Sequence, residues 1–378
     1  MKHILFSILF CFYLSFVFSQ EKENSSPKFY LHSLASISLN QSSCKEYLNF
    51  WINFLYEEND SIRKKYWLPS QIKQFGNDYS LFYSSLFQYP QKSLLNYFKP
   101  YILSISSQGD TCYITTSFCH FNFTPNDTNA SLNSNPFAIV EIGILKQNNN
   151  LYLFNLFEER IANWKKYNYD KIKYIIEPSL NPNELEMEKA KNFLDSMIYI
   201  FSAKIDSVNF VVCKSPESLG YLLGFNFFYA GYTTGKTFYD AKMIISGKGI
   251  FYYPHELVHL VVDNKIKTGH FLSEGIATFF GGSLNQSYSN LLKVFKSKYY
   301  PFNKNLFKTI NEKPNSTDAY VSSALIVNVI YKKFGIKGLL RLKDFKDNAD
   351  SCLKQIYYEF KITETEMFKL INDELGKF

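Results

Sequence analysis

Residues 253–260 read YPHELVHL and place two histidines, His255 and His259, four positions apart in an apolar run. Residues four apart lie on one face of an α-helix, so both imidazoles can reach a single metal ion. Glu256 lies one position round the helix, where its carboxylate can reach a water on that ion instead of the ion itself. A metal lowers the pKa of such a water and a carboxylate can take its proton. The stretch therefore predicts a zinc hydrolase site.

The residues around the two histidines predict a helix that is buried on most sides. Pro254 suits the first helical turn, where a missing N–H costs nothing, and most of the remaining positions are apolar. Two imidazoles and a carboxylate are costly to bury without a partner, and a cation supplies one. The alternative, a chance pentapeptide on a core helix, requires buried charge without a partner, which is rare.

A catalytic zinc takes three protein ligands and leaves a fourth position open. Glu274 is the predicted third ligand because it begins a second helical pattern after a loop long enough for the chain to turn back. The small residues Gly275 and Ala277 would let the two helices approach closely. His270 is the rival third ligand, but nothing fixes its spacing to the first histidine, and we favour an ordinary loop histidine.

With His255, Glu256, His259 and Glu274 quoted, the chain resembles the gluzincins, the thermolysin-like HExxH group with a downstream glutamate. Within that group it is most similar to peptidase MA-like domains, which carry an EGxA glutamate helix, and the resemblance extends over residues 320–340. It implies a peptidase that binds one zinc per chain through the two histidines and Glu274, uses Glu256 as general base and acts on a peptide or protein. The GxMEN element that reads a free amine in one large gluzincin family is absent, so an endopeptidase is expected.

The resemblance also bears on three residues around the metal. A tyrosine or histidine often helps to hold the oxyanion in gluzincins, and Tyr320 is the candidate here, although a core tyrosine would explain it equally well. Thr278 stands where thermolysin-like enzymes carry a further acidic residue. Asp263 could orient the second histidine, or could simply be solvated at a helix end.

The N-terminus predicts a secretory signal over residues 1–19. A basic start precedes an uncharged apolar run, residues 4–18, and the mature chain is expected to begin at Gln20. That run is short for a membrane span and no second one follows, so no stable span is expected after cleavage. The protein is expected to be secreted, or to lie in the periplasm or cell envelope.

Composition argues against a nucleic-acid partner. The 378 residues include 41 Lys and Arg against 34 Asp and Glu, and the net charge of +7 is spread along the chain. The arginines occur only at positions 63, 160 and 341, whereas nucleic-acid recognition relies on arginine. An aromatic content of 18% can fill sizeable cores, and the length predicts two domains.

Five cysteines follow the signal, an odd number for an exported chain. Cys112 and Cys119 are seven apart in a strand-like run, so they would face opposite sides of a continuous strand and are not expected to bridge each other. No CxxC occurs, so neither a thiol redox site nor a structural zinc knuckle is indicated.

Residues 28–163 are predicted to form an α+β accessory domain. Helices are expected over 44–57 and 71–87, followed by strands over 101–106, 111–123, 137–146 and 151–157. Asn148-Asn149-Asn150 reads as a hairpin turn. Helices followed by a curved antiparallel sheet resemble the cone-like NTF2 fold. This domain lacks clustered catalytic residues, so a packing or substrate-positioning role is expected.

Residues 166–378 are predicted to form a zincin-like domain with a small sheet and a largely helical C-terminal part, which makes the fold class α+β. Strands are expected over 171–176, 207–213 and 241–245, and helices over 184–201, 216–223, 287–298, 318–334, 336–342, 352–360 and 363–375. By resemblance, the strand nearest the metal helix pairs with an extended peptide, and residues 242–246 are the candidate.

Two other functions compete with a peptidase. One is a catalytically inactive, peptidase-like binding or scaffold protein of the cell envelope, which the change at Thr278 favours. Glu256 argues against it, because a protein that performs no catalysis has no need of a carboxylate that binds no metal. The other is a metal-dependent hydrolase of an ester or amide in a cell-wall or glycan substrate, which only a substrate survey separates from a peptidase.

Overall fold

The computed structural model describes residues 28–40, 42–81, 86, 91–120, 135–262, 269–343, 345 and 348–378. They form two compact units: unit 1 comprises the chain up to Asn163 together with Pro216–Thr233, and unit 2 comprises Trp164–Ser215 and Thr234–Phe378. The expected signal over residues 1–19 and the candidate Asp263 lie outside the described residues. In the part of the chain that is described, no helix is long and apolar enough to span a membrane.

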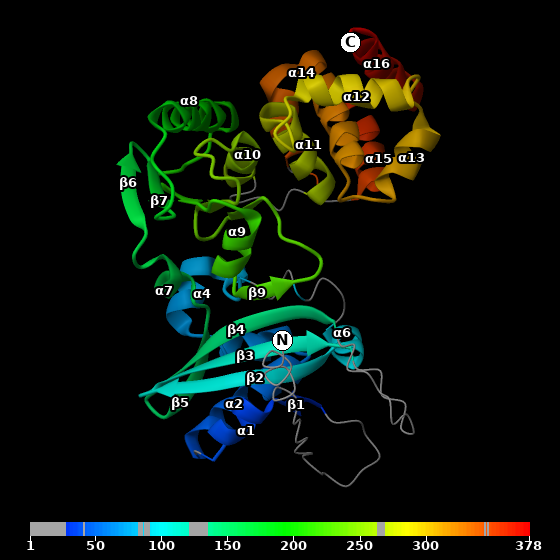
Figure 1. The fold of residues 1–378 in the computed structure, drawn as a ribbon. Helices are drawn as coiled ribbons and strands as arrows, with labels where there is room; N and C mark the ends of the chain where they lie inside the picture. Colours follow the sequence, from blue (N-terminus) through cyan, green and yellow to red (C-terminus); the bar gives the residue numbers. More distant parts are fainter. Residues whose placement is uncertain are drawn as a thin grey trace, which may run out of the picture. The chain divides into compact units, whose positions relative to one another are not determined.

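Unit 1 joins helices to one mixed sheet (Figure 1). Its elements are β1 (Tyr30–Leu31), α1 (Ser33–Ser38), α2 (Ser42–Tyr56), α3 (Asp60–Lys65), α4 (Pro69–Phe75), the 3-10 helix η1 (Gly76–Asp78), α6 (Gln91–Tyr97), β2 (Lys99–Gln108), β3 (Thr111–Cys119), β4 (Pro136–Gln147), β5 (Asn150–Phe154), α7 (Phe157–Ile161), α9 (Pro216–Leu222) and β9 (Phe225–Phe228). The strand order is β1-β2-β3-β4-β5, and β9 also pairs with β4. Only the β1–β2 pair is parallel among the described pairs of this sheet.

The predicted helices and strands of unit 1 largely match the structure. Helix α2 packs its apolar face on the sheet, where the Trp51 indole Nε1 donates to Thr116 Oγ1 on β3 at 2.9 Å. The hairpin turn occurs as predicted, since Asn148 and Asn149 take the positive φ values that a tight turn between β4 and β5 requires. The predicted helix over 71–87 is confirmed only in its first part: α4 ends at Phe75, Gly76 has a φ of 58°, and η1 follows. Residues 82–85 and 87 lie outside the described residues.

The segment Pro216–Thr233, which contains α9 and β9, was expected in the second domain but lies in unit 1. Strand β9 extends the sheet by pairing antiparallel with β4. The Arg160 guanidinium pairs with Glu141 at 2.6 Å and lies 3.9 Å from the centre of the Tyr221 ring. The Arg160 side chain is only 4% exposed and contacts both Glu141 on β4 and Tyr221 on α9, so it ties the segment to the rest of unit 1.

Unit 2 contains a small sheet and a group of helices. Its elements are β6 (Lys165–Tyr169), β7 (Ile172–Ile176), α8 (Glu184–Phe201), β8 (Val208–Val212), β10 (Gly235–Phe238), β11 (Met243–Ser246), α10 (Pro254–Val262), α11 (His270–Gly281), α12 (Tyr288–Tyr299), α13 (Lys304–Asn311), α14 (Thr317–Leu342), α15 (Ala349–Phe360) and α16 (Glu364–Gly376). The strand order is β10-β11-β8-β7-β6; the three inner strands are parallel and both edge strands are antiparallel to their neighbours.

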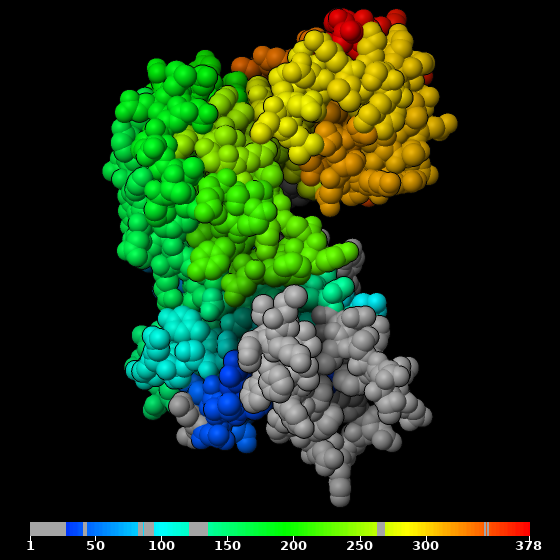
Figure 2. Space-filling model, in the orientation of Figure 1, coloured from blue at the N-terminus to red at the C-terminus, as the bar shows by residue number. Residues whose placement is uncertain are grey.

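One apolar core runs through unit 2, from the sheet across α8 and α10 into the C-terminal helices. Those helices, yellow to red, form one continuous body in the space-filling view (Figure 2). Helix α10 is apolar on nearly all sides, and every residue from His255 to Val262 is buried. The predicted break after Phe334 is present, because Gly335 interrupts α14 with a φ of 62°. Polar groups on α10 are therefore held inside a packed helix layer.

Candidate metal centre

Three side chains from two helices meet in unit 2. His255 and His259 lie on α10 and Glu274 lies on α11, and their ligand atoms are all within 4.8 Å of one another. His255 Nε2 is 3.2 Å from His259 Nε2 and 3.2 Å from Glu274 Oε2. His259 Nε2 is 3.5 Å from Glu274 Oε1. The structure thus brings together the three residues that the sequence analysis proposed as metal ligands.

Small residues on α11 allow the close helix approach that this meeting needs. A Cβ on Gly281 would lie 2.4 Å from the backbone nitrogen of His255, so α10 and α11 touch backbone to backbone there. A Cβ on Gly275 would lie 2.0 Å from Ser323 Oγ on α14. Ser323 Oγ in turn donates to the Phe271 carbonyl at 2.7 Å. Helix α11 is therefore held between two neighbours, with Glu274 directed towards the histidines.

The second nitrogen of each imidazole has its own partner. His255 Nδ1 is 2.7 Å from the carbonyl oxygen of Gly282, and His259 Nδ1 is 3.0 Å from Ser273 Oγ. Such partners orient a metal-binding imidazole and fix which nitrogen faces the ion. Thr278, at the position where thermolysin-like enzymes carry an acid, is fully buried. Here a backbone carbonyl and a serine hydroxyl contact the imidazoles instead.

The charge balance of the site also fits a cation. Burial alone would raise the pKa of Glu274, but the charge of His259 and hydrogen bonds from His255 and His259 outweigh it, so the pKa lies well below its usual range. Glu274 is therefore an anion, next to two imidazole nitrogens directed at the same point. Two imidazoles and one carboxylate are the ligand set of many catalytic zinc sites, so the residues present fit zinc.

Glu256 lies beside the three ligands without being one of them. It is buried, and Thr237 Oγ1 on β10 donates to its Oε2 at 2.7 Å. A Cβ on Gly235 would lie 2.9 Å from Glu256 Oε1 and 2.4 Å from the Tyr253 ring. Two residues of the edge strand β10 therefore position this carboxylate: Thr237 donates a hydrogen bond to it, and Gly235, which has no side chain, leaves room for it.

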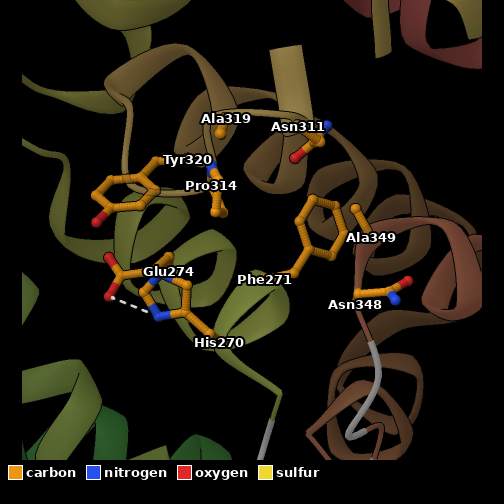
Figure 3. Close-up of a pocket in the computed structure, with 9 residues that line it drawn as sticks. All are labelled: His270, Phe271, Glu274, Asn311, Pro314, Ala319, Tyr320, Asn348 and Ala349. Atoms are coloured by element: carbon orange, nitrogen blue, oxygen red, sulfur yellow. Dashed lines mark ion pairs between the residues drawn. The ribbon is translucent and has the colours of Figure 1, made fainter. Parts of the chain in front are cut away.

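His270 and Tyr320 lie on either side of Glu274 (Figure 3). His270 Nδ1 is 3.8 Å from Glu274 Oε1, while its Nε2 is 2.9 Å from Asn315 Oδ1, and half of the side chain is exposed. Among the described residues, His270 does not belong to the group of side chains whose ligand atoms lie close enough together to bind one metal ion. The Tyr320 ring centre is 6.4 Å from that of His255. Burial raises the pKa of Tyr320, and the charges of Glu274 and Glu256 raise it further, which keeps the hydroxyl protonated.

The strand predicted to pair with a peptide is wrong. Residues 242–246 overlap β11, whose two sides are paired to β10 and β8. The edge strand is β10, at Gly235–Phe238, which runs antiparallel to β11. Its short GKTF sequence, which begins with glycine and contains lysine, has little strand character, so the pattern alone did not reveal it.

Sequence reasoning missed Thr237, Ser273 and the Gly282 carbonyl. Ser273 directly precedes the proposed ligand Glu274, and this adjacency was the one signal that could have suggested it. Thr237 precedes Glu256 by 19 residues, and only the pairing of β10 with β11 brings it near. A backbone carbonyl leaves no trace in the sequence.

A scan against protein-family models and a search of curated proteins each find no match. Among solved structures, the chain is similar to an M1 zinc metallopeptidase from Deinococcus radiodurans, with 11% identity and a TM-score of 0.37 over 72% of this chain and 63% of that chain. It is also similar to a variant of a two-domain M1 zinc metallopeptidase bound to L-tryptophan, with 12% identity and a TM-score of 0.39 over 72% and 64%.

The chain spans just under two thirds of the length of either solved structure. Likeness at these TM-scores is too slight to carry an argument about function. The case for a function rests on the side chains of the metal centre.

Proposed function

We propose that this chain is an exported zinc-dependent peptidase of the endopeptidase type. The observation that carries the proposal is the position of Glu256. A structural zinc site is closed by four protein ligands, whereas a catalytic site has three and leaves a position open. Here three ligand side chains meet, and a fourth side chain, the acidic Glu256, lies beside them, oriented by Thr237 instead of by the metal centre. A site that only stabilised the fold would have no use for this carboxylate.

The proposed reaction is hydrolysis of a peptide bond. Bound zinc would supply Lewis acidity, which polarises a carbonyl and acidifies a water. Glu256 accepts the proton of the attacking water and returns it to the leaving amine, and Thr237 keeps its carboxylate aimed during both transfers. The protonated hydroxyl of Tyr320 is a candidate donor to the oxyanion. An extended substrate would add to the sheet at β10, the edge strand.

The first test is elemental analysis of the purified mature chain for zinc. About one zinc per chain is expected, lost in His259→Ala and in Glu274→Ala and retained in His270→Ala. Zinc retained in Glu274→Ala but lost in His270→Ala would reverse the assignment of the third ligand. A folded wild type that neither contains nor takes up zinc would refute the proposal and favour an envelope binding protein.

The second test separates catalysis from metal binding. Glu256→Gln is expected to keep zinc and to lose hydrolysis of internally quenched peptides. Peptides blocked at both ends should be cleaved as readily as free ones, because an endopeptidase needs no free amine. Full activity in Glu256→Gln would exclude the assigned base. Cleavage confined to ester or glycan-linked amide substrates would move the assignment to another hydrolase class.

A further inference from the structure

A cavity of about 380 Å³ opens beside Glu274, within the size range of pockets that hold small molecules, and neither His255 nor His259 is among its lining residues. Its walls come from α11, α13 and the first residues of α14 and α15. Figure 3 shows the residues that line it: His270, Phe271, Glu274, Asn311, Pro314, Ala319, Tyr320, Asn348 and Ala349. Because Glu274 belongs both to this cavity and to the metal centre, a group bound in the cavity would lie next to the reacting bond.

Most of the wall is apolar and rigid. The Phe271 ring packs edge-on against Phe307, with ring centres 5.8 Å apart, and this contact fixes its orientation. Pro314, Ala319 and Ala349 complete the apolar surface without filling the space. A cavity of this kind favours a large apolar body over a charged one, because none of the described lining residues other than Glu274 carries a permanent charge.

Asn311 gives the wall one hydrogen-bond acceptor. Its Nδ2 donates to the Phe307 carbonyl at 2.8 Å and to Ser322 Oγ at 3.1 Å, and the Ser322 hydroxyl itself donates to Ala319. These bonds assign the nitrogen and the oxygen of the Asn311 side-chain amide. The Asn311 Oδ1 is buried and has no hydrogen-bond partner among the described residues. Figure 3 shows it directed towards the space between Pro314 and Phe271.

Two other polar side chains of the wall, Asn348 and His270, have hydrogen-bond partners that do not line the cavity. The side-chain Oδ1 of Asn348 accepts from the Ser351 backbone N–H at 3.1 Å as the N-cap of α15, and His270 Nε2 contacts Asn315 Oδ1. A buried acceptor without a partner is costly. The group that suits this cavity therefore brings a donor to Asn311 on an apolar body.

We propose that the cavity binds the substrate side chain next to the scissile bond and selects an uncharged side chain with a donor at its tip, tyrosine above phenylalanine. This inference rests on the proposed peptidase function and names the substrate class of the same site. A carboxylate would place its lone pairs against Asn311 Oδ1 and its charge near the Glu274 anion, so it is disfavoured. An ammonium would lose its water for one neutral acceptor, because the charge of Glu274 interacts with His255 and His259, so it is disfavoured as well.

The test uses the zinc-loaded full chain and a set of end-blocked peptides that differ at one residue beside the cleavage site: tyrosine, phenylalanine, glutamate, lysine or alanine. For the wild type, kcat/KM for the tyrosine peptide should exceed that for the phenylalanine peptide by roughly tenfold, because only tyrosine satisfies the buried acceptor. Sequencing the products assigns the position that matters.

Two variants test the residues that line the cavity. Asn311→Leu keeps the volume of the side chain and removes the hydrogen-bond acceptor, so the ratio of kcat/KM for the tyrosine peptide to that for the phenylalanine peptide should fall to about one. Because Asn311 also bonds to α14, this change could lower stability, so Ala349→Leu serves as a second variant that narrows the cavity without touching those bonds. It should lower the ratio of tyrosine to alanine cleavage roughly tenfold. Lys308→Leu, on the exposed side of α13, is the matched control and should change neither ratio.

The outcomes separate this inference from the proposed function. Cleavage of the alanine peptide with equal rates for tyrosine and phenylalanine, or unchanged ratios in both Asn311→Leu and Ala349→Leu, would overturn the pocket assignment and leave the peptidase intact. Absence of cleavage of every peptide by the zinc-loaded wild type would overturn both. A preference for glutamate or lysine would show that the cavity binds a charged group, which also contradicts the assignment.

Discussion

Replacing Gly275 with alanine tests whether the close contact between α11 and α14 positions the metal ligand beside it. The new Cβ would lie 2.0 Å from Ser323 Oγ, 2.7 Å from its Cβ and 3.0 Å from its backbone carbon. A side-chain end could rotate away, but the Cβ and the backbone cannot, so α11 must move. Overpacking of this severity costs about 3 kcal/mol, and the higher helix propensity of alanine returns about 1 kcal/mol. The net loss is about 2 kcal/mol.

Thermal unfolding of unit 2, followed by circular dichroism at saturating zinc, measures this loss. A unit of roughly 200 residues loses roughly 2–4 °C of Tm per kcal/mol, so Gly275→Ala should melt roughly 4–8 °C lower. The shift of α11 also moves the neighbouring Glu274, so zinc affinity should fall in a competition titration with a chelator. Gly376→Ala is the control, because a Cβ there meets nothing within 4 Å, and its Tm should not fall.

A double-mutant cycle isolates the contact. In a Ser323→Gly background the obstructing hydroxyl and Cβ are gone, so most of the steric cost of about 3 kcal/mol should disappear, and Gly275→Ala should become neutral or stabilising by up to about 1 kcal/mol. An equal cost in both backgrounds would refute the steric explanation. A Tm and zinc affinity equal to those of the wild type in the single variant Gly275→Ala would refute the whole line of reasoning.

Three further changes test other contacts. Thr237→Val removes the hydroxyl that orients Glu256, so kcat/KM should fall about tenfold with zinc content unchanged; loss of zinc would show that the threonine acts on the metal ligands instead. Arg160→Ala leaves the partly buried Glu141 without its partner, so urea denaturation should show unit 1 less stable by about 3 kcal/mol, with unit 2 unaffected; a smaller loss than 1 kcal/mol would mean that solvent replaces the pair. A hydrogen bond from Lys191 lowers the pKa of Asp195. The contribution of Asp195 to stability is therefore present above its unfolded-state pKa and is lost as the pH falls through its folded-state pKa. Asp195→Asn should show a shallower loss of Tm below about pH 4, and a dependence of Tm on pH equal to that of the wild type in this range would contradict this.

The helix of the candidate metal centre could be predicted because the residues that reveal it are close together in the sequence. The spacing of His255 and His259 depends only on helix geometry, and the apolar residues between them indicated burial. Glu274 could be assigned because it begins a second helical pattern after a loop long enough for the chain to turn back. Gly275 was expected to let α11 approach the histidine helix, but it packs against α14, and Gly281 makes the contact with α10. The structure places Gly275 against Ser323 and brings the three side chains together.

What the sequence analysis missed depends on long-range pairing. Thr237 reaches the metal centre only because β10 is the edge strand of the sheet, and four residues that begin with glycine gave no strand signal. The misassigned peptide-pairing strand follows from the same gap, since β11 looked like an edge only while β10 was unrecognised. The transfer of Pro216–Thr233 to unit 1 depends on pairing between β9 and β4, which are far apart in the chain.

The interrupted course of the chain affects how the protein is made. Unit 1 needs strand β9, which follows the remainder of that unit only after 52 residues of unit 2. At a synthesis rate of roughly 5–20 residues per second, β9 is made several seconds after β4, the strand with which it pairs. During that delay the unpaired edge of β4 is open to other chains. Binding of the nascent chain by a holding chaperone, or shielding of β4 by its own neighbours, would protect the protein, and a fragment that ends at Asn163 is expected to aggregate.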